Sequence, residues 1–170
     1  MHLPNGHTVT TYDGHAGWMA SADRPVHDMT GSDLDAATLD ADLYLPIEMK
    51  QIFSDFNVER PEKIGNGEAY VISRRREGQP PMKFYFDEKS GLLIRIVRYA
   101  ESPLGRNPTQ IDHDDYRDLD GVKTPFQWTI ARLSGRLTIR IEQAQYNVPI
   151  DETKFTRPAS TTPEQKPPSQ

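Results

Sequence analysis

The sequence contains no cysteine. Disulfide bonds, zinc sites with thiolate ligands, cysteine nucleophiles and Cys-x-x-Cys-His haem attachment are therefore excluded within this chain. No run of about 18 apolar residues is present, so the sequence predicts no membrane-spanning segment. The N-terminus has no basic segment followed by an apolar one, so it predicts no signal peptide in this chain. Basic charge is also scarce: 20 lysines and arginines stand against 25 aspartates and glutamates, and the net charge is −5. That balance argues against nucleic acid as a partner.

The composition is that of one polar domain. With 170 residues, the chain is long enough to bury a core without disulfides. Hydrophobic residues make up 35%, fewer than in an average globular domain, which favours a half-solvated sheet and a polar tail. We expect a ragged start at residues 1–7, a single domain over residues 8–155, and a disordered tail rich in Pro, Ser and Thr over residues 156–170.

Alternating apolar residues predict an antiparallel sheet. Around the turn sequence at residues 87–91, Phe84 and Phe86 share one face before the turn, and Leu92, Ile94 and Ile96 share one face after it. This alternation around a loop that contains glycine predicts a β-hairpin. Residues 103–108 are expected to form a loop. Further strands are expected at residues 8–12, 16–21, 24–29, 56–64, 68–75, 109–117, 122–131 and 136–146.

One stretch changes to helical spacing. Residues 30–33 offer side-chain oxygens that could cap a helix, and apolar residues follow at rough helical intervals. Pro46 interrupts this pattern, and a second short helix is expected to start there with proline in its first turn. Residues 31–54 are thus expected to be helical. The sequence predicts an α+β fold in which one or two short helices pack on an antiparallel β-sheet.

An apolar stripe is the feature that bears most on function. Two interpretations remain open: a filled core between sheet and helices, or a cavity that holds a lipid or an acyl chain. The expected helical stretch is short for so wide a face and is not expected to cover all of it, and the sequence alone does not separate a filled core from a cavity. One face of the sheet is expected to collect Phe84, Phe86, Leu92, Ile94, Ile96, Phe126, Trp128, Ile130, Leu137, Ile139 and Ile141.

Residues that could catalyse a reaction or bind a metal are present without a suitable arrangement. The histidines have no recognised metal-ligand spacing, and neighbours in a strand point to opposite faces. Most acidic residues fall in expected turns or on polar strand faces. The sequence has no Gly-x-Ser-x-Gly motif and no glycine-rich phosphate loop. We therefore expect no enzymatic activity, no metal and no cofactor. The histidines are His2, His7, His15, His27 and His113.

Four short blocks of the sequence follow a known pattern. They are Tyr-Asp-Gly-x-x-Gly-Trp at 12–18, Phe-Asp-x-x-x-Gly-Leu-Leu at 86–93, Asp-Tyr-Arg-Asp-x-Asp-Gly-Val-x-x-Pro at 115–125, and Asn-Val-Pro-Ile-Asp-x-x-x-Phe-x-x-Pro at 147–158. With these blocks, residues 8–158 resemble the lipoprotein-carrier-like family of bacterial outer-membrane lipoprotein carriers and sorting proteins. The version that they resemble most is a C-terminal domain of chains named as the multihaem cytochrome c subunit of a photosynthetic reaction centre.

The resemblance implies a curved sheet, or half-open barrel, wrapped around helices, with a hydrophobic cavity for acyl chains. It also implies a periplasmic or cell-envelope location. The family usually has a helix and several strands ahead of the first block, and we expect these to be missing here. Our main hypothesis is a non-enzymatic envelope protein that binds a lipid, a lipoprotein acyl chain or another apolar ligand in a cavity between sheet and helices. The alternative is a structural or interaction module with a filled core, alone or appended to a multihaem cytochrome. Such a module would self-associate through an open sheet edge.

Overall fold

The computed structural model describes residues 2–3, 6–21, 24–42, 45, 49, 56–74, 81–103 and 105–157. The chain divides into two compact units, one made of Met1–Leu45 with Pro149–Gln170 and the other of Pro46–Val148. The single domain over residues 8–155 stays a prediction. Most of the expected tail, from residue 158 onward, lies outside the described residues.

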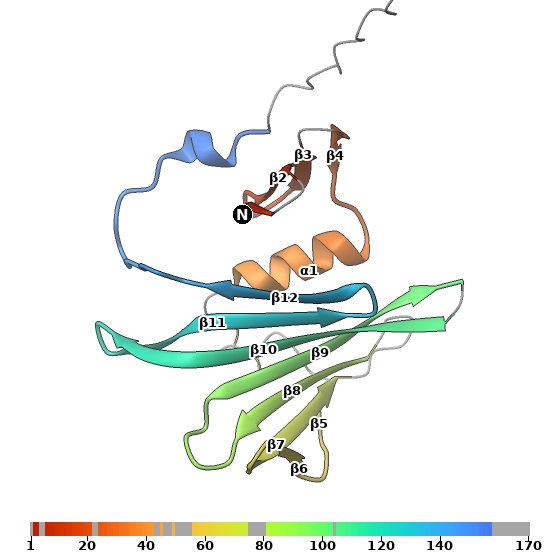
Figure 1. The fold of residues 1–170 in the computed structure, drawn as a ribbon, viewed down its shortest axis with the longest axis vertical. Coiled ribbons are helices and arrows are strands. Elements are labelled where there is room, and N and C mark those ends of the chain that lie inside the picture. The colour runs from red at the N-terminus through yellow and green to blue at the C-terminus, as the bar shows by residue number, and fades with distance from the viewer. Residues whose placement is uncertain are drawn as a thin grey trace, which may run out of the picture. The chain divides into compact units, whose positions relative to one another are not determined.

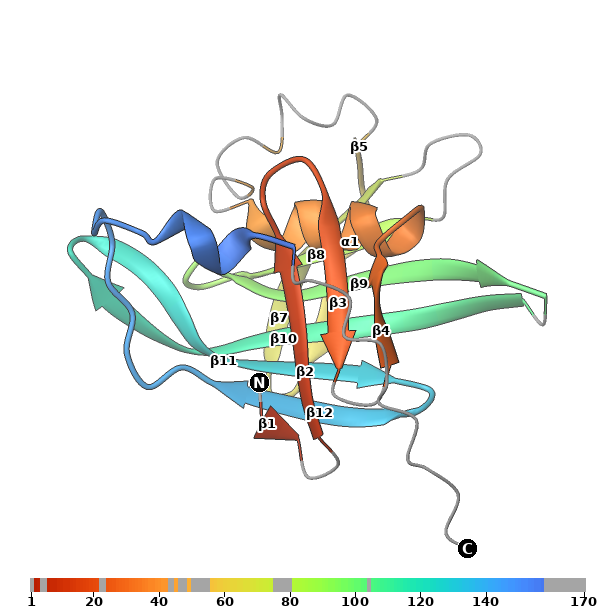
Figure 2. The same ribbon diagram turned by 90° about the horizontal axis from the view of Figure 1, so that it is seen from above.

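The first unit contains a small antiparallel sheet in the order β1-β2-β3-β4. Figure 2 shows β2, β3 and β4 side by side. The turn between β2 and β3 is held by Asp13, whose Oδ1 accepts hydrogen bonds from the backbone N–H groups of His15 and Ala16 at 2.8 and 2.7 Å. The three strands expected over residues 8–29 are confirmed. The strands are β1 (His2–Leu3), β2 (Gly6–Tyr12), β3 (Gly17–Ser21) and β4 (Arg24–Asp28).

The same unit contains helix α1 (Ser32–Ala41) and a short 3-10 helix η1 (Glu152–Phe155). The N-cap of α1 is Gly31, and no side chain caps the helix, so the capping oxygens expected at residues 30–33 are not used in that way. Arg157, which follows η1, pairs with Asp28 at the end of β4, Nε to Oδ1 at 2.9 Å. This contact ties the two ends of the described chain into one unit.

The helical prediction is confirmed in part. The helix expected over residues 31–54 starts where the pattern indicated but ends at Ala41, and Asp42 has extended backbone. The second helix expected at Pro46 lies outside the described residues, apart from Leu45 and Met49, which are both buried.

The second unit is an eight-stranded antiparallel sheet in the order β12-β11-β10-β9-β8-β7-β5, with β6 also paired to β7. Figure 1 shows it as a strongly twisted, curved sheet. Among the described strands, β12 forms one edge and β5 with β6 the other, so the sheet is not closed into a barrel. The predicted α+β class with a curved antiparallel sheet is confirmed. The strands are β5 (Phe56–Val58), β6 (Glu62–Ile64), β7 (Gly67–Arg74), β8 (Met82–Asp87), β9 (Leu93–Ser102), β10 (Gly105–Leu119), β11 (Val122–Arg132) and β12 (Gly135–Arg140).

The central hairpin predicted from the sequence is β8–β9. Asp87 organises its turn, because its Oδ2 accepts hydrogen bonds from the backbone N–H and the hydroxyl of Ser90, at 2.8 and 2.7 Å. Gly91 has φ +70°, a conformation that favours glycine, and its N–H donates to the Asp87 carbonyl at 2.8 Å. The turn residues therefore form the turn for which their chemistry is suited.

Three of the expected boundaries are wrong. The single strand expected over residues 56–64 is split into β5 and β6, with Pro61 between them, where a residue without an N–H interrupts the ladder. The loop expected over residues 103–108 is instead largely the start of β10, in which Pro108 pairs with Tyr99. Proline is tolerated there because the register with β11 begins only at Gln110, so Pro108 has a described neighbour on one side alone. The last strand ends at Arg140 rather than at residue 146.

Candidate ligand-binding face

The register of the large sheet brings one apolar residue from each strand on the path from β5 to β12 into a single line. Cross-strand partners share a face of a sheet, and successive residues of a strand alternate between faces. We call this line the apolar row and its side of the sheet the Phe84 face; the other side is the Val71 face. The apolar row consists of Val58, Ile72, Phe84, Ile96, Ile111, Ile130 and Leu137.

Burial varies along the apolar row. Phe84 at its centre is 0% exposed, and Ile96 and Ile111 are 5% and 4% exposed. Val58 at one end is 82% exposed, and Leu137 at the other end is partly exposed. The centre of the row is therefore a packed core, and apolar surface becomes accessible toward both edges of the sheet.

A second line of side chains, His113, Trp128 and Ile139, runs beside the row on β10, β11 and β12. Trp128 pairs with His113 on one side and with Ile139 on the other. The rings of Trp128 and His113 meet edge to face, with centroids 6.2 Å apart and an interplanar angle of 81°. Phe126 and Ile141 extend the Phe84 face by a further pair, since the Ile141 N–H donates to the Phe126 carbonyl at 2.8 Å. The Phe84 face thus carries three apolar residues on β11 and three on or just after β12.

Most of the residues expected to share a face do so. That they line a ligand cavity stays a prediction. Leu92 precedes β9 in the hairpin connection and belongs to no strand. The residues found on the Phe84 face are Phe84, Phe86, Ile96, Phe126, Trp128, Ile130, Leu137, Ile139 and Ile141.

Ile94 is an exception, and its expected position on the Phe84 face is wrong. The register between β8 and β9 shifts by one residue between Tyr85 and Phe86, which marks a β-bulge. Beyond the shift Phe86 pairs with Leu93, which is 8% exposed, in place of Ile94. Ile94 packs instead against the cluster of Ala69, Val71 and Tyr85 on the Val71 face. A one-residue slip moves a side chain to the opposite face.

The apolar row also includes residues that the sequence pattern did not single out. Ile111 lies in a strand that looks polar, between Gln110 and Asp112, and only its pairing with Ile96 and Ile130 reveals its place. Ile72 and Val58 were not recognised for the same reason. The available signal was alternation within each strand, but a row depends on the register between strands.

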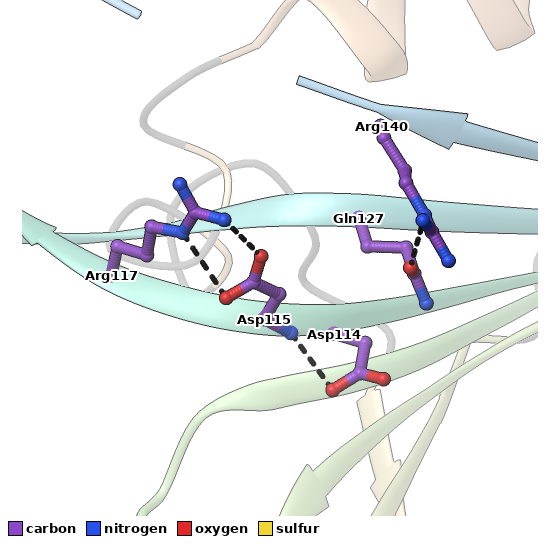
Figure 3. A network of polar contacts seen from close by, with 5 residues as sticks. All are labelled: Asp114, Asp115, Arg117, Gln127 and Arg140. Atoms are coloured by element: carbon purple, nitrogen blue, oxygen red, sulfur yellow. Dashed lines mark hydrogen bonds and ion pairs between the residues drawn. The ribbon is translucent and has the colours of Figure 1, made fainter. Parts of the chain in front are cut away.

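A polar group bounds the Phe84 face near the β10–β11 turn (Figure 3). The Arg117 guanidinium lies over the Phe126 ring at 4.3 Å and donates from Nε and Nη2 to the two carboxylate oxygens of Asp115, at 3.1 and 2.5 Å. These hydrogen bonds hold the pKa of the Asp115 carboxyl below its usual value. Asp115 has φ +52°, uncommon for a residue within a strand. Nearby, Arg140 Nε donates to Gln127 Oε1 at 3.1 Å. The charges of Arg117 and Asp115 are thus paired with each other, whereas Gln127 and Arg140 lie on the Val71 face.

The Val71 face carries partly buried ion pairs. Lys83 Nζ lies 2.7 Å from Glu59 and 3.2 Å from Glu62, and the hydrogen bond to Glu59 raises the pKa of Lys83. Arg95 pairs with Asp112. With a raised pKa, Lys83 stays protonated and is unsuited to act as a base. We infer that these ion pairs hold neighbouring segments of the sheet together.

Tyr116 is a further partly buried polar group. Its hydroxyl donates to the Leu93 carbonyl at 2.5 Å, and desolvation raises the pKa of the phenol to about 12. The phenol therefore stays neutral in the ordinary pH range. In the part of the chain that the structure describes, no group of three or more His, Cys, Asp or Glu residues is placed to hold a metal ion. None of the helices described there is long and apolar enough to span a bilayer.

Comparison with known proteins bears on the fold. No protein-family model and no curated protein matches the chain. A domain from Vibrio parahaemolyticus named for outer membrane lipoprotein sorting matches over 82% of this chain and 63% of its own length, with a TM-score of 0.53 and 14% identity. The chain has a lipoprotein-carrier-like fold. A DUF1329 family protein from Desulfovibrio piger ATCC 29098 matches over 83% of this chain and 62% of its own length, with a TM-score of 0.52 and 17% identity.

These matches confirm the fold part of the family resemblance. Sequence identity of 14% and 17% is too low to carry activity or ligand from one chain to another, because one fold hosts many functions. The chain spans less than two thirds of the length of both proteins. The properties of the Phe84 face itself therefore bear on the function of this chain.

Proposed function

We propose that this chain is a non-enzymatic protein of the bacterial periplasm or cell envelope that binds a lipid, or the acyl chain of a lipoprotein, on the Phe84 face. The observation that carries the proposal is the apolar row, which crosses the sheet from edge to edge and becomes accessible at both ends. Exposed apolar surface, such as that at the two ends of the row, is typical of interaction or ligand sites.

The accessible β10–β12 end of the row has room for part of an acyl chain. Neighbouring strands lie ~4.8 Å apart, so this end is roughly 10 Å wide. The acyl chains of one bilayer leaflet span about 15 Å, half of the hydrocarbon core. A chain laid along the β10–β12 end of the row would transfer its methylene groups from water to Ile130, Leu137 and Ile139. Each buried methylene contributes about 0.8 kcal/mol, and part of that gain is offset by the lost freedom of the ligand.

The assignment to the envelope rests on the fold. The similar domain from Vibrio parahaemolyticus is named as an outer membrane lipoprotein-sorting domain. A half-open sheet with an apolar face is compatible with binding the acyl chains of a lipoprotein. No covalent step is required for carriage. The ion pairs of Lys83 and Arg95 are satisfied within the protein, which supports a role in holding strands together rather than in catalysis.

The test is native mass spectrometry of the purified chain combined with organic extraction and lipid analysis. We expect a bound species identified as phospholipid, fatty acid or lipopeptide. Ile139→Glu places a charge on the Phe84 face and should abolish lipid uptake. Thr138→Glu is the matched control, because Thr138 is the neighbouring residue of β12, exposed and on the Val71 face. An apo spectrum that does not change on addition of lipid would refute the proposal.

A second candidate is an interaction module that pairs through a sheet edge, alone or appended to a multihaem cytochrome. The observation that favours it is the edge strand β12, six residues long, which has β11 as its described neighbour on one side. The opposite edge is less suitable, because it is divided between the short strands β5 and β6. Exposed backbone on an edge strand can accept an added strand. Dimeric species without lipid in the same mass spectra would favour this candidate over the first.

A further inference from the structure

Arginines recur at one position of alternate strands on the Phe84 face. They are Arg74 on β7, Arg98 on β9 and Arg132 on β11. In each strand the arginine stands two residues from an isoleucine of the apolar row, so the two side chains share a face. The cross-strand register joins these positions into a second row, which we call the arginine line. It consists of Phe56, Arg74, Met82, Arg98, Thr109 and Arg132.

The charge of the arginine line is of one sign. Met82 and Thr109 separate the arginines, and no residue of the line among those described is acidic. On the Val71 face, by contrast, Lys83 and Arg95 each lie within hydrogen-bond distance of a carboxylate. Arg132 is exposed, and Arg98 is partly buried. Partial burial strengthens the attraction of a guanidinium group for an anion, because water screens it less.

The arginine line lies directly beside the apolar row. Two residues of a strand span about 7 Å, so a group held at Arg132 places the atoms that follow it over Ile130. Ile130 is partly exposed, and so is Leu137, its partner on β12. A ligand with an anionic head and an apolar tail is the complement of such a surface.

We propose that the arginine line is the head-group site of the Phe84 face and that the protein binds anionic phospholipids, whose phosphate accepts hydrogen bonds from Arg98 and Arg132. This inference rests on the proposed function, since it concerns which lipid binds and not whether lipids bind. The two arginines are two strands, or about 10 Å, apart at the backbone, and Thr109 between them has a short side chain that leaves room for a phosphate.

The chemistry of the head group favours this class of lipid. The N–H groups of a guanidinium match the geometry of phosphate oxygens, and their charge-assisted hydrogen bonds are among the strongest in proteins. A fatty acyl chain attached to a protein carries no phosphate, so the arginine line favours a phospholipid over a lipoprotein as the ligand.

The experiment compares two lipids with the same chain and different head-group charge, myristoyl lysophosphatidylglycerol, which is anionic, and myristoyl lysophosphatidylcholine, which is zwitterionic. The choline ammonium balances the phosphate charge and is repelled by the arginines. Isothermal titration calorimetry below the micelle concentration gives the affinity of each lipid. One hydrogen bond between charged groups corresponds to about a tenfold preference for the anionic lipid, and added salt should reduce that preference.

Arg132→Gln and Arg98→Gln remove one charge each and keep a polar side chain, so the preference should fall to about twofold or less. The ratio of two affinities is insensitive to a general loss of packing in a variant. Arg136→Gln is the matched control. Arg136 is exposed like Arg132 and lies in the same hairpin, but it pairs with Ala131 on the Val71 face. This control removes the same charge from the protein and should keep the preference.

Inorganic phosphate, titrated alone, distinguishes a lipid head group from a free anion as the occupant of the arginine line. We expect phosphate to bind far more weakly than the anionic lipid, because it lacks the apolar tail. Phosphate that binds as tightly as the lipid would show an anion site independent of lipid and would overturn the assignment to a head group.

The remaining outcomes separate the two proposals. Equal binding of the two lipids by the unmodified protein, or a preference that survives in both Arg98→Gln and Arg132→Gln, would overturn the role of the arginine line while leaving lipid binding intact. A preference lost equally in Arg136→Gln would reveal general charge attraction and overturn that role as well. Failure of both lipids to bind would overturn the proposed function and this inference with it. A preference lost on the arginine line and kept in Arg136→Gln supports both.

Discussion

Phe84→Ala removes the side chain at the centre of the apolar row, and its effect measures how tightly that centre is packed. Phe84 is 0% exposed and pairs with Ile72 on one side and Ile96 on the other. Its ring meets that of Phe56 edge to face, with centroids 6.4 Å apart and an interplanar angle of 82°. Replacing a fully buried phenylalanine with alanine costs about 3–5 kcal/mol, of which the aromatic pair accounts for about 0.5–1.5 kcal/mol.

Urea unfolding followed by far-ultraviolet circular dichroism gives the free energy of unfolding for each variant. The matched control is Phe86→Ala, which changes the same residue type on the same strand and face, where the side chain is only partly buried. We expect a smaller loss there, about 1–2 kcal/mol, because only the buried part of the ring contributes. A double-mutant cycle of Phe84→Ala with Phe56→Ala should show a coupling of about 0.5–1.5 kcal/mol.

Equal losses in Phe84→Ala and Phe86→Ala, or a loss below about 1 kcal/mol in the former, would contradict this reasoning. The centre of the row would then not be a packed core. A large loss at Phe84 combined with unchanged lipid uptake at Ile139 substitutions would favour the filled-core interpretation over a ligand face.

Three further predictions concern the turn, the small sheet and an ion pair. Asp87→Ala should lower the urea midpoint at neutral pH. Hydrogen bonds from Ser90 lower the pKa of the Asp87 carboxyl from its usual 3.8. The stabilisation that the ionised Asp87 gives to the folded state is therefore present above pH 3.8 and is lost as the pH falls through the folded-state pKa. The difference in stability between the variant and the parent protein should vanish in acid. Gly17→Ala places a Cβ 2.8 Å from Met29 Sδ and 3.3 Å from the Thr11 carbonyl oxygen and should cost about 1–3 kcal/mol, but less in a Met29→Ala background, which relieves the first contact. Asp112→Ala leaves its partly buried arginine partner unpaired and should cost about 1–3 kcal/mol in the same urea assay, whereas Asp112→Asn should cost less.

Local chemistry explains which parts of the fold were predictable from the sequence. The β8–β9 hairpin follows from alternation on either side of a turn in which Asp87, Ser90 and Gly91 each take the role their side chains favour. The strands of the first unit follow from equally local signals, whereas α1 starts near the expected residue without the side-chain cap that indicated it. The class of the fold is a consequence of these elements, since hairpins in sequence give an antiparallel sheet.

The errors arise where neighbouring strands decide the outcome. Ile94 changes face because of a bulge that depends on how β9 pairs with β8, which no pattern within β9 records. Pro108 is accepted in β10 because β11 is too short to reach it. Ile111 belongs to the apolar row through its partners Ile96 and Ile130. In each case the signal lies in pairing between segments distant in sequence, and periodicity within one segment does not contain it.

Site prediction was limited in the same way. Aromatic and branched residues of β11 and β12 were recognised as one face because their alternation is regular. The contact of Trp128 with His113 could not be anticipated, because a tryptophan in a strand shows nothing in sequence about its cross-strand neighbour. The position of the Arg117 guanidinium over the Phe126 ring likewise depends on the pairing of β10 with β11, which the pattern within either strand does not record.

Photo-crosslinking with a fatty acid that carries a diazirine on its chain tests the central claim most directly. After irradiation, proteolysis and mass spectrometry identify the modified residues. The account predicts labels on the Phe84 face over β11 and β12, at Trp128, Ile130 or Leu137, and protection of these positions by an excess of unlabelled lipid. Labels confined to the Val71 face, for example at Ile94 or Val97, or labelling that unlabelled lipid does not reduce, would contradict it.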